Sequence, residues 1–407
     1  MINLAQDERE KVIASIKVIG VGGGGGNTIN SIIASGCNDI EFIATNTDAQ
    51  ALDLSKAHQR VQIGIKSTKG LGTGADPELG KRSAEEDLDK ILESVGHADI
   101  VFLTAGLGGG TGSGALPVIA RALKDKGVLS IAIVTKPFLF EGKRRSNVAE
   151  AALEQLKKEV DTLIVIPNQK LLEVVDQHVS MIDAFSMIND VLGQSVKGIS
   201  DIITKPGHIN VDFADVRTIM KDRGLAVMGT ARASGERRAE EAALKAISSP
   251  LLENMDIEGA RGVLLNITGG PSLGIHEISQ AASVIYEQAD QDASIIIGSV
   301  IDEELGDDIS ITLIATGFNT HDQKHMSIQE SDDLLATAQP KQTATVELKQ
   351  VTEKEQKAVP TAEPTPAPAP KPEPIKSAPE TKEELLDVSA LDIPAFMRQN
   401  TDQQNDN

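Results

Sequence analysis

The chain has 407 residues, of which 40% are hydrophobic, and its 60 acidic and 39 basic side chains give a formal net charge of −21. This charge excludes nonspecific binding to nucleic acid or to an anionic membrane, because like charges repel. The single cysteine, Cys37, excludes an internal disulfide, and no signal peptide or run of ~20 apolar residues is evident. We therefore expect a soluble, cytoplasmic protein of two or three domains.

Apolar runs alternate with helical patterns along the first 170 residues. The predicted strands are 15–20, 41–47, 99–105, 128–134 and 162–166, and the predicted helices are 28–35, 78–95, 115–123 (with Pro117 in its first turn) and 147–159. This alternation predicts an α/β fold with a parallel sheet covered on both faces. Ligands bind such sheets at the carboxyl ends of the strands, where the segments 21–27, 71–77 and 106–114 and Asn168 all fall.

The second half is predicted to begin with a long helix, residues 179–204, which would span roughly 37 Å. Strands at 225–233, 262–268, 294–301 and 309–315 and helices at 236–247 and 276–289 predict a smaller α+β domain. From residue 319 the sequence is charged and proline-rich without apolar periodicity, which predicts a disordered linker. Within this polar tail, Leu391–Arg398 carries four bulky apolar residues and is predicted to be a docking peptide.

The segment 106–114, Gly-Leu-Gly-Gly-Gly-Thr-Gly-Ser-Gly, lies between a predicted strand and a predicted helix. Glycine lets a ligand approach the backbone closely, and a helix N-terminus offers unpaired N–H groups and a positive partial charge. The segment is therefore predicted to bind phosphate. A second glycine run, 22–26, lies in the same kind of turn, and neither run is followed by the Lys-Ser/Thr of a Walker P-loop.

Two other motifs suggest different chemistry. Gly20–Gly25 satisfies G-x-G-x-x-G after a strand, so an NAD-dependent oxidoreductase is the alternative function. Gly270–Gly274 satisfies the G-x-S-x-G pattern of a nucleophile elbow, but the later histidines beyond the following helix lie in the predicted linker. We interpret this motif as a turn with a helix cap. The seven histidines are scattered, and no metal site is predicted.

An acidic segment, Asn210-Val-Asp212-Phe-Ala-Asp215, follows the long predicted helix. Asp212 fits a helix N-cap with Asp215 as the acidic third residue, which is the pattern of a capping box. Alternatively, the three carbonyl-bearing side chains could position a water or a cation. The residues alone leave both interpretations open.

Together, these motifs resemble the tubulin/FtsZ family of GTPases that act in bacterial cell division. The resemblance covers nearly all of residues 12–318 and the tail peptide. Ser113 stands where the family also commonly has Thr, and Met397 stands where it usually has Leu. The motifs that carry it are Gly22–Asn27, Asn46–Asp48, Gly108–Gly114, Phe140–Arg145, Asn168, Phe185 with Asp190, Asn210–Asp215 and Leu391–Arg398.

The resemblance implies a tubulin-type, Rossmann-like GTP-binding domain (12–178), a central helix (179–204) and a second domain (205–318). A flexible N-terminus (1–11), a disordered linker (319–388) and a docking segment (389–407) complete the implied organisation. It also implies GTP or GDP with Mg²⁺ as cofactors. The nucleotide-binding residues would be Gly23, Gly24, Gly25, Gly26, Asn27, Gly74, Ala75, Gly108, Gly109, Gly110, Thr111, Gly112, Glu141, Arg145, Asn168, Phe185 and Asp190.

By the same resemblance, Asp190 would read guanine, Phe185 would stack on the base, and Glu141 and Arg145 would contact the sugar and phosphate region. Asn210, Asp212 and Asp215 would be catalytic in the adjoining subunit of a head-to-tail filament. The filaments would form the cytokinetic ring at midcell, and the tail peptide would bind membrane-tethering division proteins. Neither nucleic-acid binding nor direct membrane insertion is expected.

Overall fold

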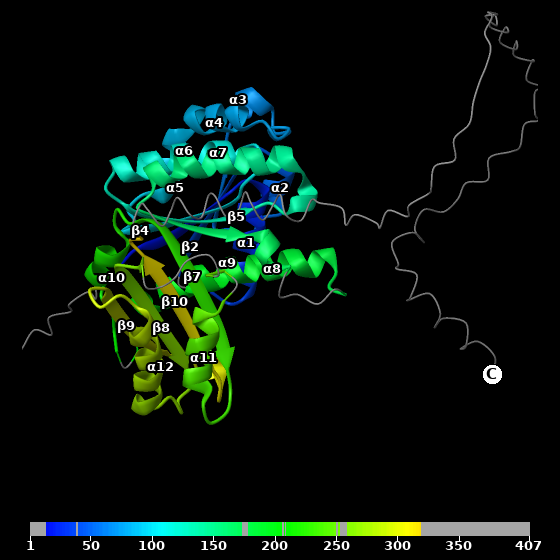
Figure 1. Ribbon diagram of the computed structural model, residues 1–407. Coiled ribbons are helices and arrows are strands. Elements are labelled where there is room, and N and C mark those ends of the chain that lie inside the picture. The colour runs from blue at the N-terminus through cyan, green and yellow to red at the C-terminus, as the bar shows by residue number, and fades with distance from the viewer. Residues whose placement is uncertain are drawn as a thin grey trace, which may run out of the picture. The chain divides into compact units, whose positions relative to one another are not determined.

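The computed structural model describes residues 14–37, 40–172, 178–205, 207, 209–249, 251–252 and 259–318. The predicted flexible N-terminus, the linker and the docking peptide lie outside these residues. A ten-stranded sheet with the order β3-β2-β1-β4-β5-β6-β7-β10-β8-β9 runs through the described part (Figure 1). Its strands are β1 Ile16–Val21, β2 Glu41–Asn46, β3 Gln59–Gln62, β4 Ile100–Gly106, β5 Leu129–Lys136, β6 Thr162–Pro167, β7 Gly224–Ala233, β8 Gly262–Gly269, β9 Ser294–Ile301 and β10 Ile309–Thr316.

The first six strands are parallel. Five of them were predicted from the sequence, and β3 was not. β6 pairs with β7 through Thr162–Ile164 and Gly224–Ala226, so the sheet continues into the second half of the chain. There β10 runs antiparallel to both β7 and β8. The predicted bounds of the two domains and the central helix, 12–178, 179–204 and 205–318, stay predictions.

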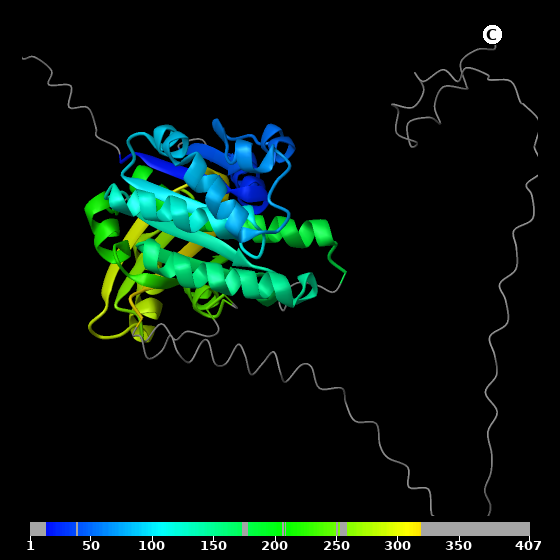
Figure 2. The same ribbon diagram turned by 90° about the horizontal axis from the view of Figure 1, so that it is seen from above.

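Helices cover both faces of the sheet. They are α1 Gly22–Ala34, α2 Ala49–Asp53, α3 Ile65–Thr68, α4 Pro77–Glu86, α5 Leu88–Val95, α6 Thr111–Asp125, α7 Lys143–Glu159, α8 Asn168–Leu171, α9 Met181–Thr204, α10 Phe213–Met220, α11 Arg238–Ile247 and α12 Ile275–Gln288. Figures 1 and 2 show α4 to α7 on one face, whereas α1, α9 and α10 share an apolar core on the other. That second core includes residues from β1 to β10, so α9 packs on both halves of the sheet.

Several helix boundaries differ from the prediction, and α7 begins at Lys143, four residues before its predicted start. α1 begins at Gly22 and α6 at Thr111, so both glycine segments continue into helices and Pro117 lies inside α6 rather than in its first turn. Tertiary packing overrides the low helix propensity of glycine here. A Cβ at Gly25 would lie 2.5 Å from the carbonyl oxygen of Thr104. The predicted helix 78–95 is two helices, because the Asp87 side chain between them accepts a hydrogen bond from the Gly64 N–H.

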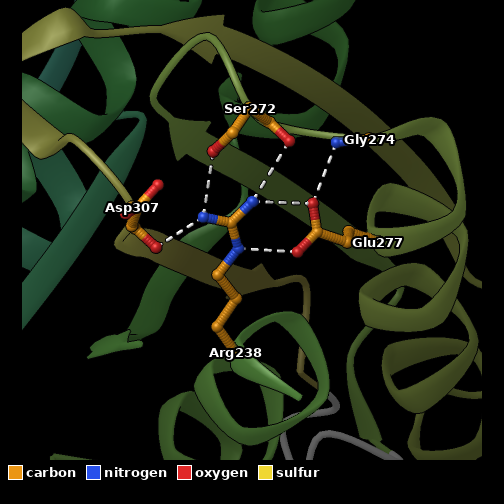
Figure 3. Close-up of polar contacts among 5 residues, drawn as sticks. All are labelled: Arg238, Ser272, Gly274, Glu277 and Asp307. Atoms are coloured by element: carbon orange, nitrogen blue, oxygen red, sulfur yellow. Dashed lines mark hydrogen bonds and ion pairs between the residues drawn. The ribbon is translucent and has the colours of Figure 1, made fainter. Parts of the chain in front are cut away.

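A buried guanidinium joins three segments of the second half (Figure 3). Arg238, at the start of α11, is 8% exposed and forms a two-pronged ion pair with Glu277 of α12, at 2.6 and 2.9 Å. It also donates to Ser272 and to the carbonyl oxygen of Asp307. Glu277 accepts from the Gly274 N–H at 2.9 Å, so the G-x-S-x-G segment is a turn with a helix cap, as interpreted.

Candidate functional site

A cavity of about 390 Å³ lies at the carboxyl ends of β1, β4, β5 and β6. Its wall comes from the first turns of α1 and α6, from the loops that follow β4 and β5, and from one side of α9. The lining residues are Val21, Gly22, Gly23, Gly24, Asn27, Thr28, Thr73, Gly106, Leu107, Gly109, Gly110, Thr111, Gly112, Thr135, Pro137, Glu141, Arg145, Asn168, Phe185, Ile188, Asn189 and Leu192. The cavity therefore brings together the segments 21–27, 71–77 and 106–114 and Asn168 at this edge of the sheet, as predicted.

Two helices begin at this cavity, and their first turns are open to a ligand. No side chain of the described residues caps the N-terminus of α1 at Val21 or that of α6 at Gly110. Neither helix has an acidic residue in its first turn. The N–H groups of a first turn lack partners within the helix, and the helix dipole adds positive partial charge. Two such N-termini on one cavity make a site for phosphate groups that needs little basic side-chain charge.

Backbone segments approach one another so closely at this site that some positions have no room for a side chain. Gly22 has a φ of +71°, a conformation that favours glycine, and a Cβ at Gly24 would lie 2.8 Å from the Gly106 nitrogen. In contrast, a Cβ at Gly23 or Gly109 would meet no described atom within 4 Å. These two glycines line the cavity, so a side chain at either would enter the space that a ligand needs.

Three threonine hydroxyls lie close together at the start of α6. The Thr111 Oγ1 lies 2.7 Å from that of Thr47 and 3.4 Å from that of Thr73. All three side chains are buried. They tie the start of α6 to the segment after β2 and to the loop 71–77.

Asn168 reaches the cavity from the end of β6. It is 5% exposed, and its Oδ1 has no hydrogen-bond partner among the described residues. A buried carbonyl oxygen without a partner is costly, so such an atom on a cavity wall indicates a ligand that donates a hydrogen bond.

Charged and aromatic side chains form another part of the cavity wall. Arg145 of α7 donates to Glu141 and forms an ion pair with it. The ring of Phe138 packs edge-on against that of Phe185, with centroids 5.4 Å apart, and stacks on Phe140 at 4.9 Å. Phe185 is 36% exposed, so part of its ring is available to a planar group.

On α9, Asn189 lines the cavity, whereas its neighbour Asp190 does not. The Oδ1 of Asp190 accepts a hydrogen bond from the Ser31 hydroxyl at 3.0 Å, and the residue is exposed. Thr28 Oγ1 is 3.2 Å from the Asn189 Oδ1 and 3.0 Å from the Gly24 carbonyl oxygen. The amide nitrogen of Asn189 donates to no described residue, so it is left for a ligand.

Eleven of the predicted nucleotide-binding residues line the cavity: Gly23, Gly24, Asn27, Gly109, Gly110, Thr111, Gly112, Glu141, Arg145, Asn168 and Phe185. Gly25, Gly26, Gly74, Ala75, Gly108 and Asp190 are not among the lining residues. Gly25 packs instead against Gly20 and Thr104, and Gly108 packs against Arg145 and Pro137. The predicted nucleotide-binding residues did not include Thr73, Thr135 or Asn189. The available signals were that Thr73 lies in the segment 71–77, that Thr135 directly follows the predicted strand 128–134, and that Asn189 is next to Asp190.

The predicted catalytic residues Asn210, Asp212 and Asp215 lie outside the cavity lining. They follow α9, which lines the cavity from Phe185 to Leu192 and continues for about 18 Å to its end at Thr204. Asp212 is the N-cap of α10, and its Oδ1 accepts from the Asp215 N–H at 2.9 Å, so the helix-cap interpretation is confirmed for Asp212. Both carboxylates are exposed.

Comparison with known proteins gives the family. The model of the tubulin/FtsZ family GTPase domain matches residues 15–176, and that of the FtsZ family C-terminal domain matches residues 224–319. An FtsZ dimer from M. jannaschii, described as empty, shares 42% identity over 76% of this chain and 89% of its own, with a TM-score of 0.73. The chain belongs to the tubulin/FtsZ family of GTPases.

Two more solved structures agree with this assignment. A variant of FtsZ from M. jannaschii shares 43% identity over 75% of this chain and 92% of its own, with a TM-score of 0.72. CetZ2 from Haloferax volcanii, described as a GTPγS-bound protofilament, shares 22% identity over 79% of this chain and 99% of its own, with a TM-score of 0.65. This last likeness concerns the fold.

The protein is therefore a GTPase of a family that binds GTP and GDP. The oxidoreductase alternative is not favoured, since the matching family is a GTPase family. In the described ranges, no group of three His, Cys, Asp or Glu side chains could hold a metal ion. Likewise, no helix of the described residues has the length and apolar character needed to cross a membrane.

Proposed function

We propose that this GTPase assembles head to tail, and that the acidic loop of one subunit completes the nucleotide site of the next. The observation that carries the proposal is the separation of the two sets of residues along α9. The cavity is lined by α9 residues from Phe185 to Leu192, and Asp212 and Asp215 follow the far end of the helix. The rest of α9, about 18 Å long, keeps one subunit from closing its own site. A heterologous contact between two ends closes it and propagates a filament.

The cavity side of the proposed contact carries apolar groups. Leu139 and Phe140 are 51% and 64% exposed and directly precede the lining residue Glu141. Met181 and Ile182 are 65% and 82% exposed and lie one turn of α9 before Phe185. Exposed apolar residues gathered at one place favour a protein–protein contact. In the proposal, this rim meets the end of the neighbour that carries α10.

Within the pocket, the phosphates would accept hydrogen bonds from the first turns of α1 and α6. The Phe185 ring would stack on the base, and Glu141 with Arg145 would contact the sugar and phosphate region. We propose that the base edge is read at Asn189 or Asp190, of which Asn189 lines the cavity. The residues Gly25, Gly26, Gly74, Ala75 and Gly108 would then shape the backbone of the pocket rather than touch the ligand.

Mg²⁺ would enter with the nucleotide, because it is commonly held by substrate phosphates and a few protein oxygens. The hydroxyls of Thr73 and Thr111 on the wall are suitable oxygen donors. When bound, the ion would offset the charge of the phosphates.

For hydrolysis, the neighbour's loop would supply Asp212 and Asp215. Among the described residues, none hydrogen bonds the Asp215 carboxylate, which is exposed at the start of α10. A carboxylate can accept a proton of a water molecule and orient it toward the terminal phosphate. Turnover would then depend on assembly.

In the cell, we propose that the filaments form the cytokinetic ring at midcell in the cytoplasm. The segment Leu391–Arg398 would bind membrane-tethering division proteins through a flexible linker. Deletion of residues 390–407 should leave GTP hydrolysis and filament formation intact while abolishing recruitment to the membrane. A truncated chain that cannot polymerise would contradict this role for the tail.

The proposal is tested by light scattering and phosphate release, measured in parallel over a range of protein concentrations. With GTP, both signals should rise together above a critical concentration, and ATP should support neither. Full GTP turnover by demonstrably monomeric protein would contradict a shared site. Equal binding of GTP and ATP in equilibrium dialysis would contradict the assignment of the pocket.

A further inference from the structure

The acidic loop is attached to β9 through one buried serine. The Ile209 N–H donates to the Ser299 Oγ, and the Ser299 N–H donates to the Ile209 carbonyl oxygen, both at 3.0 Å. Ser299 is 1% exposed and lies near the end of β9. The loop before Asp212 is therefore held as a short antiparallel bridge on the sheet.

The fit around this bridge is close on both sides. A Cβ at Gly207 would lie 1.7 Å from the Ser299 carbonyl oxygen, so the backbone of the loop rests directly on β9. A Cβ at Gly298 would lie 2.3 Å from the Ile202 side chain and 3.1 Å from that of Val211. The end of α9 and the loop therefore pack against the same part of β9.

Asn210 closes the loop upon itself. Its Oδ1 accepts a hydrogen bond from the Gly207 N–H at 2.8 Å. Because the donor is a backbone N–H, the side-chain atom must be the carbonyl oxygen. The side chain of Asn210 is therefore used within its own loop, whereas the exposed carboxylate of Asp215 is not bonded by any described residue.

We propose that Ser299 and Asn210 are positioning residues for the acidic loop: Ser299 attaches the loop to β9, and Asn210 fixes its turn. They act on hydrolysis through the placement of Asp212 and Asp215, and neither contacts the nucleotide. This inference rests on the proposed function. It reassigns Asn210, which the sequence interpretation placed among the catalytic residues.

The test compares Ser299→Ala with Ser299→Thr, which keeps the hydroxyl and suits a strand. The matched control is Ser195→Ala, because Ser195 is 0% exposed and its hydroxyl bonds only the Val191 carbonyl of its own helix in the described structure. For each protein, nucleotide affinity of the monomer, critical concentration, kcat per assembled subunit and KM for GTP are measured. Thermal unfolding shows whether each variant is folded.

Ser299→Ala should lower kcat about tenfold, because a displacement of about 1 Å can cost up to 100-fold in rate. KM and monomer affinity should stay within about twofold of the wild type, and Ser299→Thr should restore most of kcat, since it restores the acceptor for the Ile209 N–H. Ser195→Ala should behave as the wild type. A wild-type kcat for folded, assembled Ser299→Ala would overturn the role of Ser299, and a loss confined to nucleotide affinity would do so too.

Asn210 is tested by a second pair. Asn210→Asp keeps an acceptor for the Gly207 N–H, whereas Asn210→Ala removes it. If the side chain only fixes the turn, Asn210→Asp should retain most of kcat while Asn210→Ala loses about as much as Ser299→Ala. Equal losses in both variants would show that the amide N–H₂ group itself is needed and would overturn the reassignment. A wild-type chain that neither assembles nor hydrolyses GTP would overturn the proposed function, and this inference with it.

Discussion

The hydroxyls of Thr47 and Thr111 lie 2.7 Å apart, although 64 residues separate them in the chain. Thr111 is the first residue of α6 and lines the cavity proposed to bind the nucleotide, whereas Thr47 directly follows β2. Both residues are buried: Thr111 is 9% exposed and Thr47 is 0% exposed. The hydrogen bond therefore fixes the start of the phosphate-binding helix to a different strand of the sheet.

Thr47→Val should weaken GTP binding about fivefold, because it keeps the shape of the side chain but removes a hydrogen bond worth about 1 kcal/mol. Equilibrium dialysis measures the affinity, and urea unfolding measures the stability. Thr45→Val is the matched control: the Thr45 Oγ1 is buried and has no partner in the described structure. That control should bind GTP normally and be as stable as the wild type or more so. An unchanged affinity in Thr47→Val would contradict a role for the hydroxyl pair in the pocket.

Gly23→Val should abolish GTP binding without unfolding the protein. A Cβ at Gly23 meets no described atom within 4 Å, and the residue lines the cavity, so the new side chain would occupy the space of the ligand. Gly26 lies three residues further along α1, has equally open surroundings and does not line the cavity. Gly26→Val should therefore bind GTP. Retained binding in Gly23→Val, or equal loss in both variants, would show that the cavity is misassigned.

The ion pair of Arg238 and Glu277 should make stability depend on pH (Figure 3). The hydrogen bond from Arg238 holds the pKa of Glu277 below its ordinary value of 4.5. A carboxylate with a lowered pKa stabilises the folded state above about pH 4.5, and this contribution is lost as the pH falls through the pKa of the folded state. Glu277→Gln should cost about 3 kcal/mol at pH 7, since it leaves a buried guanidinium without its counter-ion.

Denaturant unfolding at pH 7 and at two values below 4.5 measures this effect. The difference between the wild type and Glu277→Gln should shrink as the pH falls. The control is Glu240→Gln, because Glu240 pairs with Arg237 on the exposed side of α11 and should contribute little. A difference that stays constant over this pH range would contradict the proposed linkage.

Much of the parallel sheet could be predicted from the sequence, because its strands are short apolar runs between helical patterns. β3, Gln59–Gln62, could not, since its single apolar residue gives no strand signal and its position depends on pairing with β2. The start of α1 was predicted six residues too late, because glycine has a low helix propensity. Only the close packing of Gly24 and Gly25 on neighbouring strands explains a helix there.

The glycine segments of the site were likewise predictable, because their residue types carry the phosphate chemistry directly. Which side of α9 faces the cavity could not be predicted. Asn189 and Asp190 are adjacent, and which of them faces the cavity depends on how α9 is rotated against α1. The attachment of the acidic loop to Ser299 joins residues 90 positions apart, so no local pattern indicates it.

The most direct test of a shared site is to mix two defective proteins. Asp215→Ala keeps an intact cavity, and Gly23→Val keeps an intact acidic loop. Each alone should release little phosphate from GTP, but in co-assembled filaments an Asp215→Ala pocket can meet a Gly23→Val loop. The account predicts phosphate release well above the sum of the two separate proteins, with a maximum near equal amounts. Activity equal to that sum in filaments that demonstrably contain both proteins would contradict the account.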